Sequence, residues 1–67
     1  MERTYKKIEL IGVSEESYEQ AIKNAIGKAA QSVRKLDWFE VQDQRGKVID
    51  GKVVEFQVVL KVAFKLE

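Results

Sequence analysis

The sequence predicts a small α+β domain with the element order β-α-β-β, and three patterns lead to that prediction. Two segments, Tyr5–Ile11 and Trp38–Gln44, alternate apolar and polar residues, which is the period of a half-buried strand. A longer segment, Val53–Leu66, alternates in the same way and carries an apolar side chain at every second position. Between the first two, the residues after Ser14 repeat apolar side chains at helical steps of three and four. A chain of 67 residues has room for one domain, which we place at residues 1–67.

The first strand is expected to stop at Gly12, and the helix to begin at Ser14. The Ser14 hydroxyl can cap free backbone N–H groups, and acidic residues follow where the helix dipole favours them. Basic residues at the other end predict a helix of roughly 21 residues, about 31 Å long. Gly27 has two open interpretations, a tolerated surface glycine or a small residue that admits another element. The apolar stripe consists of Tyr18, Ile22, Ala25, Ile26, Ala29, Val33 and Leu36.

In the second strand, parity places Phe39 and Val41 on the core face and Trp38 on the opposite face. Two dipeptides, Arg45-Gly46 and Asp50-Gly51, are interpreted as turns, and the second is typical of a β-hairpin. Strict alternation would put the Arg45 side chain in the core. We therefore expect the strand to end or bulge near Gln44.

The long third strand is predicted to lie in the centre of an antiparallel sheet, with the helix across its apolar face. Two partners of about seven residues each would leave part of its edge unpaired, and such an edge invites another chain. Trp38, Val53 and Val59 add apolar surface on the face away from the helix. These features predict a homo-oligomer. The alternative is a monomer whose long strand curls around its helix.

Composition excludes several classes of function. The chain has no Cys and no His, which excludes disulfides and a zinc site and removes the usual general base and the thiol nucleophile. Its 12 basic and 11 acidic residues are interleaved, so no nucleic-acid partner is expected. No apolar run approaches the length of a membrane span and the first residues lack a signal-peptide core, so we expect no membrane association and a cytoplasmic protein. We therefore expect a binding protein without a metal and without catalytic residues.

Three side chains stand out as candidates for binding a planar ligand. Trp38 points away from the core, either as a stacking platform for a flat ring or as an oligomer contact. Gln57 lies on the same face, either to hydrogen-bond the edge of a heterocycle or as a solvated strand residue. Arg45 is either a ligand for a phosphate or flat ring, or an ordinary turn residue. The sequence does not fix the register that would bring these residues together within one chain or across an interface.

The chain resembles the dodecins, small flavin-binding proteins, over nearly its whole length. The resemblance rests on YKKIELIGVS at residues 5–14, LDWFEV at 36–41, Arg45-Gly46, and FQVVLKVAFKL at 56–66. It implies a β-α-β-β subunit and a hollow homododecamer that binds flavin non-covalently. It also implies that Trp38 covers the isoalloxazine, that Gln57 hydrogen-bonds its edge, and that Arg45, as in bacterial members, favours FMN over riboflavin. FMN is therefore the expected ligand, with riboflavin and FAD as alternatives. Asp37, the neighbour of Trp38, is included among the predicted cofactor-binding residues.

The function that this resemblance implies is storage of FMN and its protection from light-driven side reactions. Bacterial relatives also hold coenzyme A, so coenzyme A is a second expected ligand, for which the sequence indicates no residues. Two alternatives remain at this stage. One is a flavin-dependent redox enzyme, and the other is a structural or interaction shell whose flavin site is mostly empty.

Overall fold

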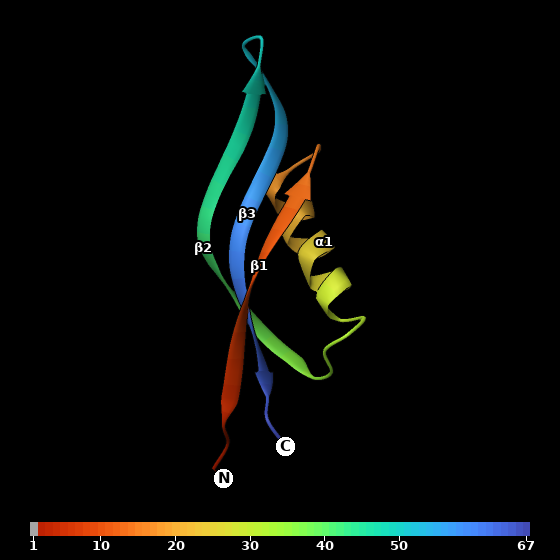
Figure 1. The fold of residues 1–67 in the computed structure, drawn as a ribbon, viewed down its shortest axis with the longest axis vertical. Helices are drawn as coiled ribbons and strands as arrows, with labels where there is room; N and C mark the ends of the chain where they lie inside the picture. The colour runs from red at the N-terminus through yellow and green to blue at the C-terminus, as the bar shows by residue number, and fades with distance from the viewer. Residues whose placement is uncertain (1) are drawn as a thin grey trace.

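A computed structural model describes residues 2–67, so that only Met1 of the predicted domain lies outside the described residues. Its elements are β1 (Tyr5–Ser14), α1 (Tyr18–Ala29), β2 (Leu36–Ile49) and β3 (Lys52–Lys65). The strands form one antiparallel sheet in the order β1-β3-β2. The subunit is elongated, 53 × 20 × 13 Å, and the β2–β3 hairpin projects beyond the end of the helix (Figure 1). The predicted β-α-β-β order and the central position of the long last strand are confirmed.

The hydrophobic core lies between α1 and the strands β1 and β3. Val58, Leu60 and Val62 of β3 are fully buried there, under Ala21 and Ala25 of the helix. Alanines on this helix face let α1 approach the sheet closely, and larger side chains pack around the edge of the contact. Those surrounding side chains are Ile8, Leu10, Tyr18, Ile22, Ile26 and Leu36.

The helix does not cover the whole sheet. Phe39 and Val41, which we expected in the core, lie on the helix side of β2 but remain 45% and 41% exposed. The reason is the contact between α1 and β1. A Cβ atom at Gly12 would lie 2.1 Å from the Ala21 carbonyl oxygen, so the glycine permits an approach that draws the helix toward β1 and away from β2.

The helix begins one turn later than predicted, because Ser14 is part of the sheet. Gly12 does not end β1, which continues until Ser14 pairs with Phe56. The Ser14 hydroxyl is buried and accepts hydrogen bonds from the backbone N–H of Glu16 (2.9 Å) and Ser17 (3.4 Å). Ser17 is the actual N-cap, and its hydroxyl accepts from the N–H of Gln20 at 3.0 Å.

The helix also ends earlier than predicted, with 12 residues in place of roughly 21. After Ala29 the chain turns, and Lys35 adopts a left-handed conformation (φ 63°) that redirects it into β2. Leu36 then pairs with Phe64 and packs against the core from the sheet. Val33 and Leu36 thus matched the helical period by spacing alone, since both lie outside the helix, and Leu36 reaches the core from a strand.

Strand β2 runs for 14 residues, twice the predicted length, and pairs with β3 from end to end. The predicted turn at Arg45-Gly46 is wrong, since Gly46 pairs with Phe56 in the sheet. The hairpin turn is at Asp50-Gly51, where both residues have positive φ (52° and 77°). Both strands are longer than predicted, but the prediction that part of the β3 edge stays unpaired is confirmed on the β1 side. The unpaired edges are the outer edges of β1 and β2, together with the part of β3 that β1 does not reach, Lys52–Glu55.

Within residues 2–67, α1 is too short to cross a membrane.

Two glycine substitutions test the helix–sheet contact. Gly12→Ala is expected to lower the free energy of unfolding by roughly 1–3 kcal/mol, because the new methyl group must displace the backbone at Ala21. Gly27→Ala is the matched control, since a Cβ at Gly27 meets nothing within 4 Å in the subunit. That change should raise stability by about 1 kcal/mol through helix propensity. Urea denaturation of both variants at one protein concentration measures the two effects, and equal responses would contradict the proposed role of Gly12.

Candidate functional site

The sheet face opposite α1 carries the candidate residues in rows that run across β1, β3 and β2. One row is Lys7, Ala63 and Trp38, and the next is Glu9, Lys61 and Glu40. Further along the strands follow Ile11, Val59 and Asp43, and then Val13, Gln57 and Arg45. Among residues 2–67 no helix covers this face, so most of its side chains are open to a ligand or to another chain.

Trp38 lies on this face as predicted, and its side chain is 43% exposed. The Tyr5 ring packs against the indole with the centroids 4.8 Å apart and the planes inclined by 57°. Ala63, between the two strands that carry these rings, is only 1% exposed. The two aromatic rings thus cover the centre of the sheet at this point, and the rest of the indole surface remains open.

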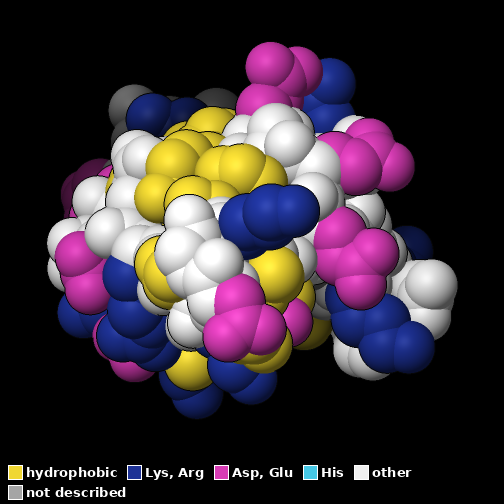
Figure 2. Space-filling model, turned by 90° about the horizontal axis from the view of Figure 1, so that it is seen from above, with side chains coloured by type: hydrophobic (Ala, Val, Ile, Leu, Met, Phe, Trp, Pro, Cys, Tyr) yellow, Lys and Arg dark blue, Asp and Glu magenta, His cyan; other side chains and the backbone are white. Residues whose placement is uncertain are grey.

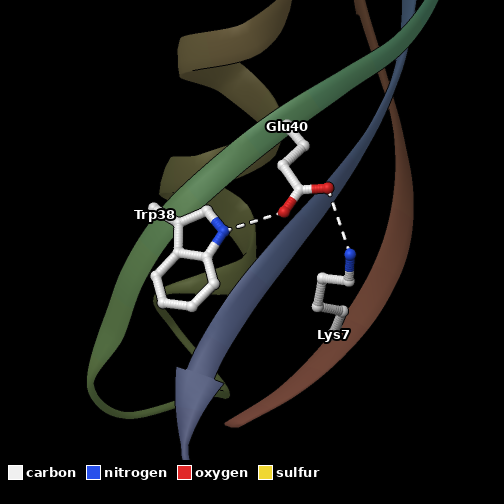
Figure 3. Close-up of polar contacts among 3 residues, drawn as sticks. All are labelled: Lys7, Trp38 and Glu40. Atoms are coloured by element: carbon white, nitrogen blue, oxygen red, sulfur yellow. Dashed lines mark hydrogen bonds and ion pairs between the residues drawn. The ribbon is translucent and has the colours of Figure 1, made fainter.

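A short polar chain fixes the indole N–H (Figure 3). The Trp38 Nε1 donates to Glu40 Oε2 at 2.9 Å, and Lys7 Nζ donates to Glu40 Oε1 at 3.1 Å from the far side of β3. The hydrogen bond from Trp38, followed by that from Lys7, lowers the pKa of Glu40, and the charges of Lys7 and Lys61 act in the same direction. Glu40 is therefore held ionised between an indole donor and two ammonium groups.

Arg45 and Gln57 lie side by side in one chain. Arg45 Nε donates to Gln57 Oε1 at 2.9 Å, and Gln57 Nε2 donates to Glu55 Oε1 at 2.7 Å. The Arg45 guanidinium also lies 3.8 Å from the Asp43 carboxylate. The register shift between Val41 and Asp43 makes this possible, because it moves Arg45 from the helix side to the side of Gln57. The predicted bulge near Gln44 is therefore confirmed, and the sheet resolves the register that the sequence left open.

Trp38 and Gln57 do not meet within one subunit. Trp38 lies opposite Ala63, which is six positions from Gln57 along β3, or about 20 Å at ~3.3 Å per residue. A flat ligand of three fused rings is shorter than this separation, so Trp38 and Gln57 of one chain do not both contact the same ring system. The chain thus carries two separate groups of candidate residues, the indole with its polar support and the Arg45–Gln57 pair.

Asp37 lies at the register shift between Leu36 and Trp38, with its side chain exposed. It borders a small hollow of about 120 Å³ that is also lined by Trp38, Phe39 and Val62. No polar partner of Asp37 is found among residues 2–67, and its position beside Trp38 is the one feature that links it to the site.

Sequence reasoning missed the residues that support Trp38. The parity that placed Trp38 on the outer face places Glu40 there as well, two residues on, which was a usable signal. Tyr5 and Lys7 come from β1, and only the pairing of β1 and β2 with the same central strand brings them near Trp38. No local pattern in the sequence indicates that pairing register.

Comparison with known proteins gives one consistent family. The dodecin family model matches residues 4–67. The chain is 51% identical over 67 residues to a dodecin from Thermus thermophilus, covering 100% of this chain and 97% of the relative. It is 34% identical over 62 residues to a calcium dodecin from Mycobacterium tuberculosis, covering 92% and 87% of the two chains. The solved structure of dodecin from Streptomyces coelicolor superposes with a TM-score of 0.93 at 48% identity, over 97% of this chain and 93% of that one.

The lowered pKa of Glu40 can be tested by titration of its side-chain carboxyl by NMR. The expected midpoint lies below the ordinary value of a glutamate carboxyl. Trp38→Phe and Lys7→Met each remove a cause of the lowered pKa, and each is expected to raise the midpoint. Because the folded-state pKa is lowered, the charge-assisted indole contact is complete near neutral pH and weakens as the pH falls through that midpoint. A Glu40 midpoint at the ordinary glutamate value would refute the hydrogen-bonded arrangement.

Proposed function

This chain belongs to the dodecin family, and we propose that it binds FMN non-covalently, stores it and shields it from light. Proteins of this family are small binding or storage proteins and are not enzymes. The alternative of a flavin-dependent redox enzyme is therefore set aside. The other alternative, a shell whose flavin site is mostly empty, would be supported if the protein does not bind FMN in the experiments below.

The observation that most supports this proposal is the exposed, laterally supported indole of Trp38. A flat aromatic ring that leaves 43% of its side chain open to solvent offers a stacking surface for another flat ring. In comparable nucleobase sites such stacking is worth roughly 1–3 kcal/mol per ring. Trp38 is the one tryptophan of the chain, so the proposed stacking surface for the isoalloxazine rests on this residue.

Gln57 and Arg45 supply the polar half of the proposed site. The side-chain amide of Gln57 has both donors and an acceptor, which suits the alternating N–H and C=O groups along the edge of a flavin. The Arg45 guanidinium, with half of its side chain exposed, suits the phosphate of FMN, which riboflavin lacks. Because these groups lie about 20 Å from Trp38 along β3, a site that uses all three residues takes them from different subunits.

Assembly into a homododecamer is part of the same proposal. The chain leaves apolar side chains exposed at the hairpin, namely Val48 (62%), Ile49 (50%) and Val53 (58%), and on both faces of the sheet. Figure 2, which views the molecule from the hairpin end, shows hydrophobic side chains gathered in one larger area beside a basic side chain, with further hydrophobic side chains lying among charged ones of both signs. A small core and such exposed apolar surface are typical of subunits that gain stability by association.

Two further ligands have weaker support. Coenzyme A remains a prediction from the family resemblance, and none of the contacts above assigns residues to it. The mycobacterial relative is named a calcium dodecin, whereas among residues 2–67 no three acidic side chains gather closely enough to hold a metal ion. Asp37 is proposed as a contact of the bound flavin only through its place next to Trp38.

Removal of the stacking surface tests the proposal. Trp38→Ala is expected to lower FMN affinity by at least about tenfold, from the loss of roughly 1–3 kcal/mol of stacking. FMN fluorescence should be strongly quenched on binding to the native protein, because an indole in van der Waals contact quenches an excited flavin. Any residual complex of the variant should be brighter. Trp38→Phe, which retains a smaller ring, should fall between the two in affinity.

Light scattering on the same samples is the control for assembly. Native protein and both variants are expected to elute as one species of about twelve subunits, because Trp38 does not contribute to the helix-packed core. If Trp38→Ala dissociates the assembly while subunits bind FMN unchanged, Trp38 is an oligomer contact and not the stacking platform.

The phosphate preference is tested at Arg45. Arg45→Ala is expected to weaken FMN about tenfold or more while changing riboflavin affinity much less, since a charge-assisted contact is worth roughly 1.5–3 kcal/mol. Titration of both ligands by fluorescence measures the difference. Equal losses for FMN and riboflavin would show that Arg45 does not recognise the phosphate and acts only through its hydrogen bond to Gln57.

A further inference from the structure

The orientation of the Trp38 ring is set by side-chain contacts and not by burial. An indole with 43% of its side chain exposed on a sheet surface is free to change rotamer unless its neighbours prevent it. Here the N–H is bonded to Glu40 at 2.9 Å, and the ring packs against Tyr5 at a centroid distance of 4.8 Å. The two contacts act on different parts of the ring, so together they define both its position and its tilt.

Glu40 is itself held by a residue on the same sheet face, on the far side of β3. Its Oε2 accepts from the indole and its Oε1 accepts from Lys7 at 3.1 Å, so each oxygen has its own partner (Figure 3). Lys7 belongs to β1 and Glu40 to β2, and the ion pair therefore crosses β3. Rotation of the carboxylate would break at least one of the two bonds. A carboxylate that only balanced the charge of Lys7 would not need a second oxygen bonded to the indole.

We propose that Glu40, held by Lys7, is a positioning residue that fixes the indole of Trp38 with its open surface ready for a planar ligand. The inference rests on the proposed flavin-binding function and adds residues to that site. A ring that is already in its binding rotamer loses less conformational entropy when the ligand arrives, and this gain appears as affinity. Glu40 does not attract the ligand by charge, since FMN is an anion and a carboxylate repels it.

Three variants separate positioning from the overall charge of this face. Glu40→Ala removes both hydrogen bonds, and Glu40→Gln keeps an oxygen for the indole but loses the ion pair with Lys7. Glu9→Gln is the matched control, because Glu9 lies in the same row of the sheet, on the far side of Lys61, without a contact to Trp38. It removes the same charge from the same face and leaves the indole support intact.

Ring mobility is measured first, in flavin-free protein. Trp38 is the one tryptophan, so its time-resolved fluorescence anisotropy reports this ring alone. Glu40→Ala is expected to add a fast decay from local ring motion, Glu40→Gln a smaller one, and Glu9→Gln none. FMN affinity, measured by fluorescence quenching, should follow the same order, with a loss of about tenfold for Glu40→Ala and no change for Glu9→Gln.

Lys7 provides a second, independent test. Lys7→Met keeps the aliphatic stem and removes the ammonium group, which frees one oxygen of Glu40. In the native background this change should weaken FMN binding, whereas in the Glu40→Ala background it should have no further effect, because Lys7 acts through Glu40. Additive losses in the two backgrounds would mean that Lys7 attracts the phosphate directly, and this would overturn the proposed tether.

The remaining outcomes are also decisive. If native protein binds FMN and Glu40→Ala binds it equally well with unchanged anisotropy, the positioning role is refuted while the flavin-binding function stands. If Glu9→Gln weakens FMN as much as Glu40→Ala does, the effect is one of surface charge and the inference is again refuted. If native protein does not bind FMN, the proposed function fails and the positioning role fails with it.

Discussion

The close contact between α1 and the β1–β3 half of the sheet is the constraint on which the rest of this subunit depends. It is made by Gly12 on the strand and Ala21 on the helix, two positions where a larger side chain would separate the layers. Because the helix is drawn to that side, the fully buried core reduces to a few residues of β3 and two alanines. The same displacement leaves Phe39 and Val41 of β2 half exposed, and the opposite sheet face carries no helix among residues 2–67.

An uncovered sheet face would be unfavourable in an isolated domain of this size, and here it carries the proposed binding residues. Three strands bring together side chains that are far apart in the chain, so that Tyr5, Lys7, Trp38 and Glu40 form one connected group. A second group, Arg45 with Gln57, forms further along the hairpin. The side chains of each group contact one another within the chain. Because the two groups lie far apart, a flavin site that uses both takes them from different chains, so the proposed site requires the proposed assembly.

Stability and ligand binding are coupled in such an arrangement. A chain of 67 residues buries a smaller share of its surface than a larger domain does, and subunit contacts or a ligand that bind only the folded state shift the equilibrium toward folding. The ionised Glu40 adds a pH dependence, since protonation of this carboxylate removes its ion pair with Lys7 and weakens the support of the indole. Folding, the proposed assembly and the proposed binding of a ligand are therefore expected to be linked.

The sequence by itself determined the element order, the central position of the long strand, the hairpin at Asp50-Gly51 and the outward direction of Trp38. These follow from period, parity and turn chemistry, which are local properties of the chain. It did not determine the ends of the helix, because Ser14 belongs to the sheet, and Leu36 packs on the core from a strand outside the helix. Where an apolar residue can reach the same core from a helix or from a strand, only the tertiary structure decides which element it belongs to.

The candidate site divides in the same way. Trp38, Gln57 and Arg45 were accessible from residue type and resemblance, and a bulge near Arg45 was expected because strict alternation would have buried a guanidinium. The tertiary structure alone decided that Arg45 lies beside Gln57, that Trp38 is about 20 Å away from them, and that Lys7 and Tyr5 support the indole. Each of these facts depends on the register between strands, which is set by the fit of side chains across the whole sheet and by the register shifts in β2 after Leu36 and after Val41.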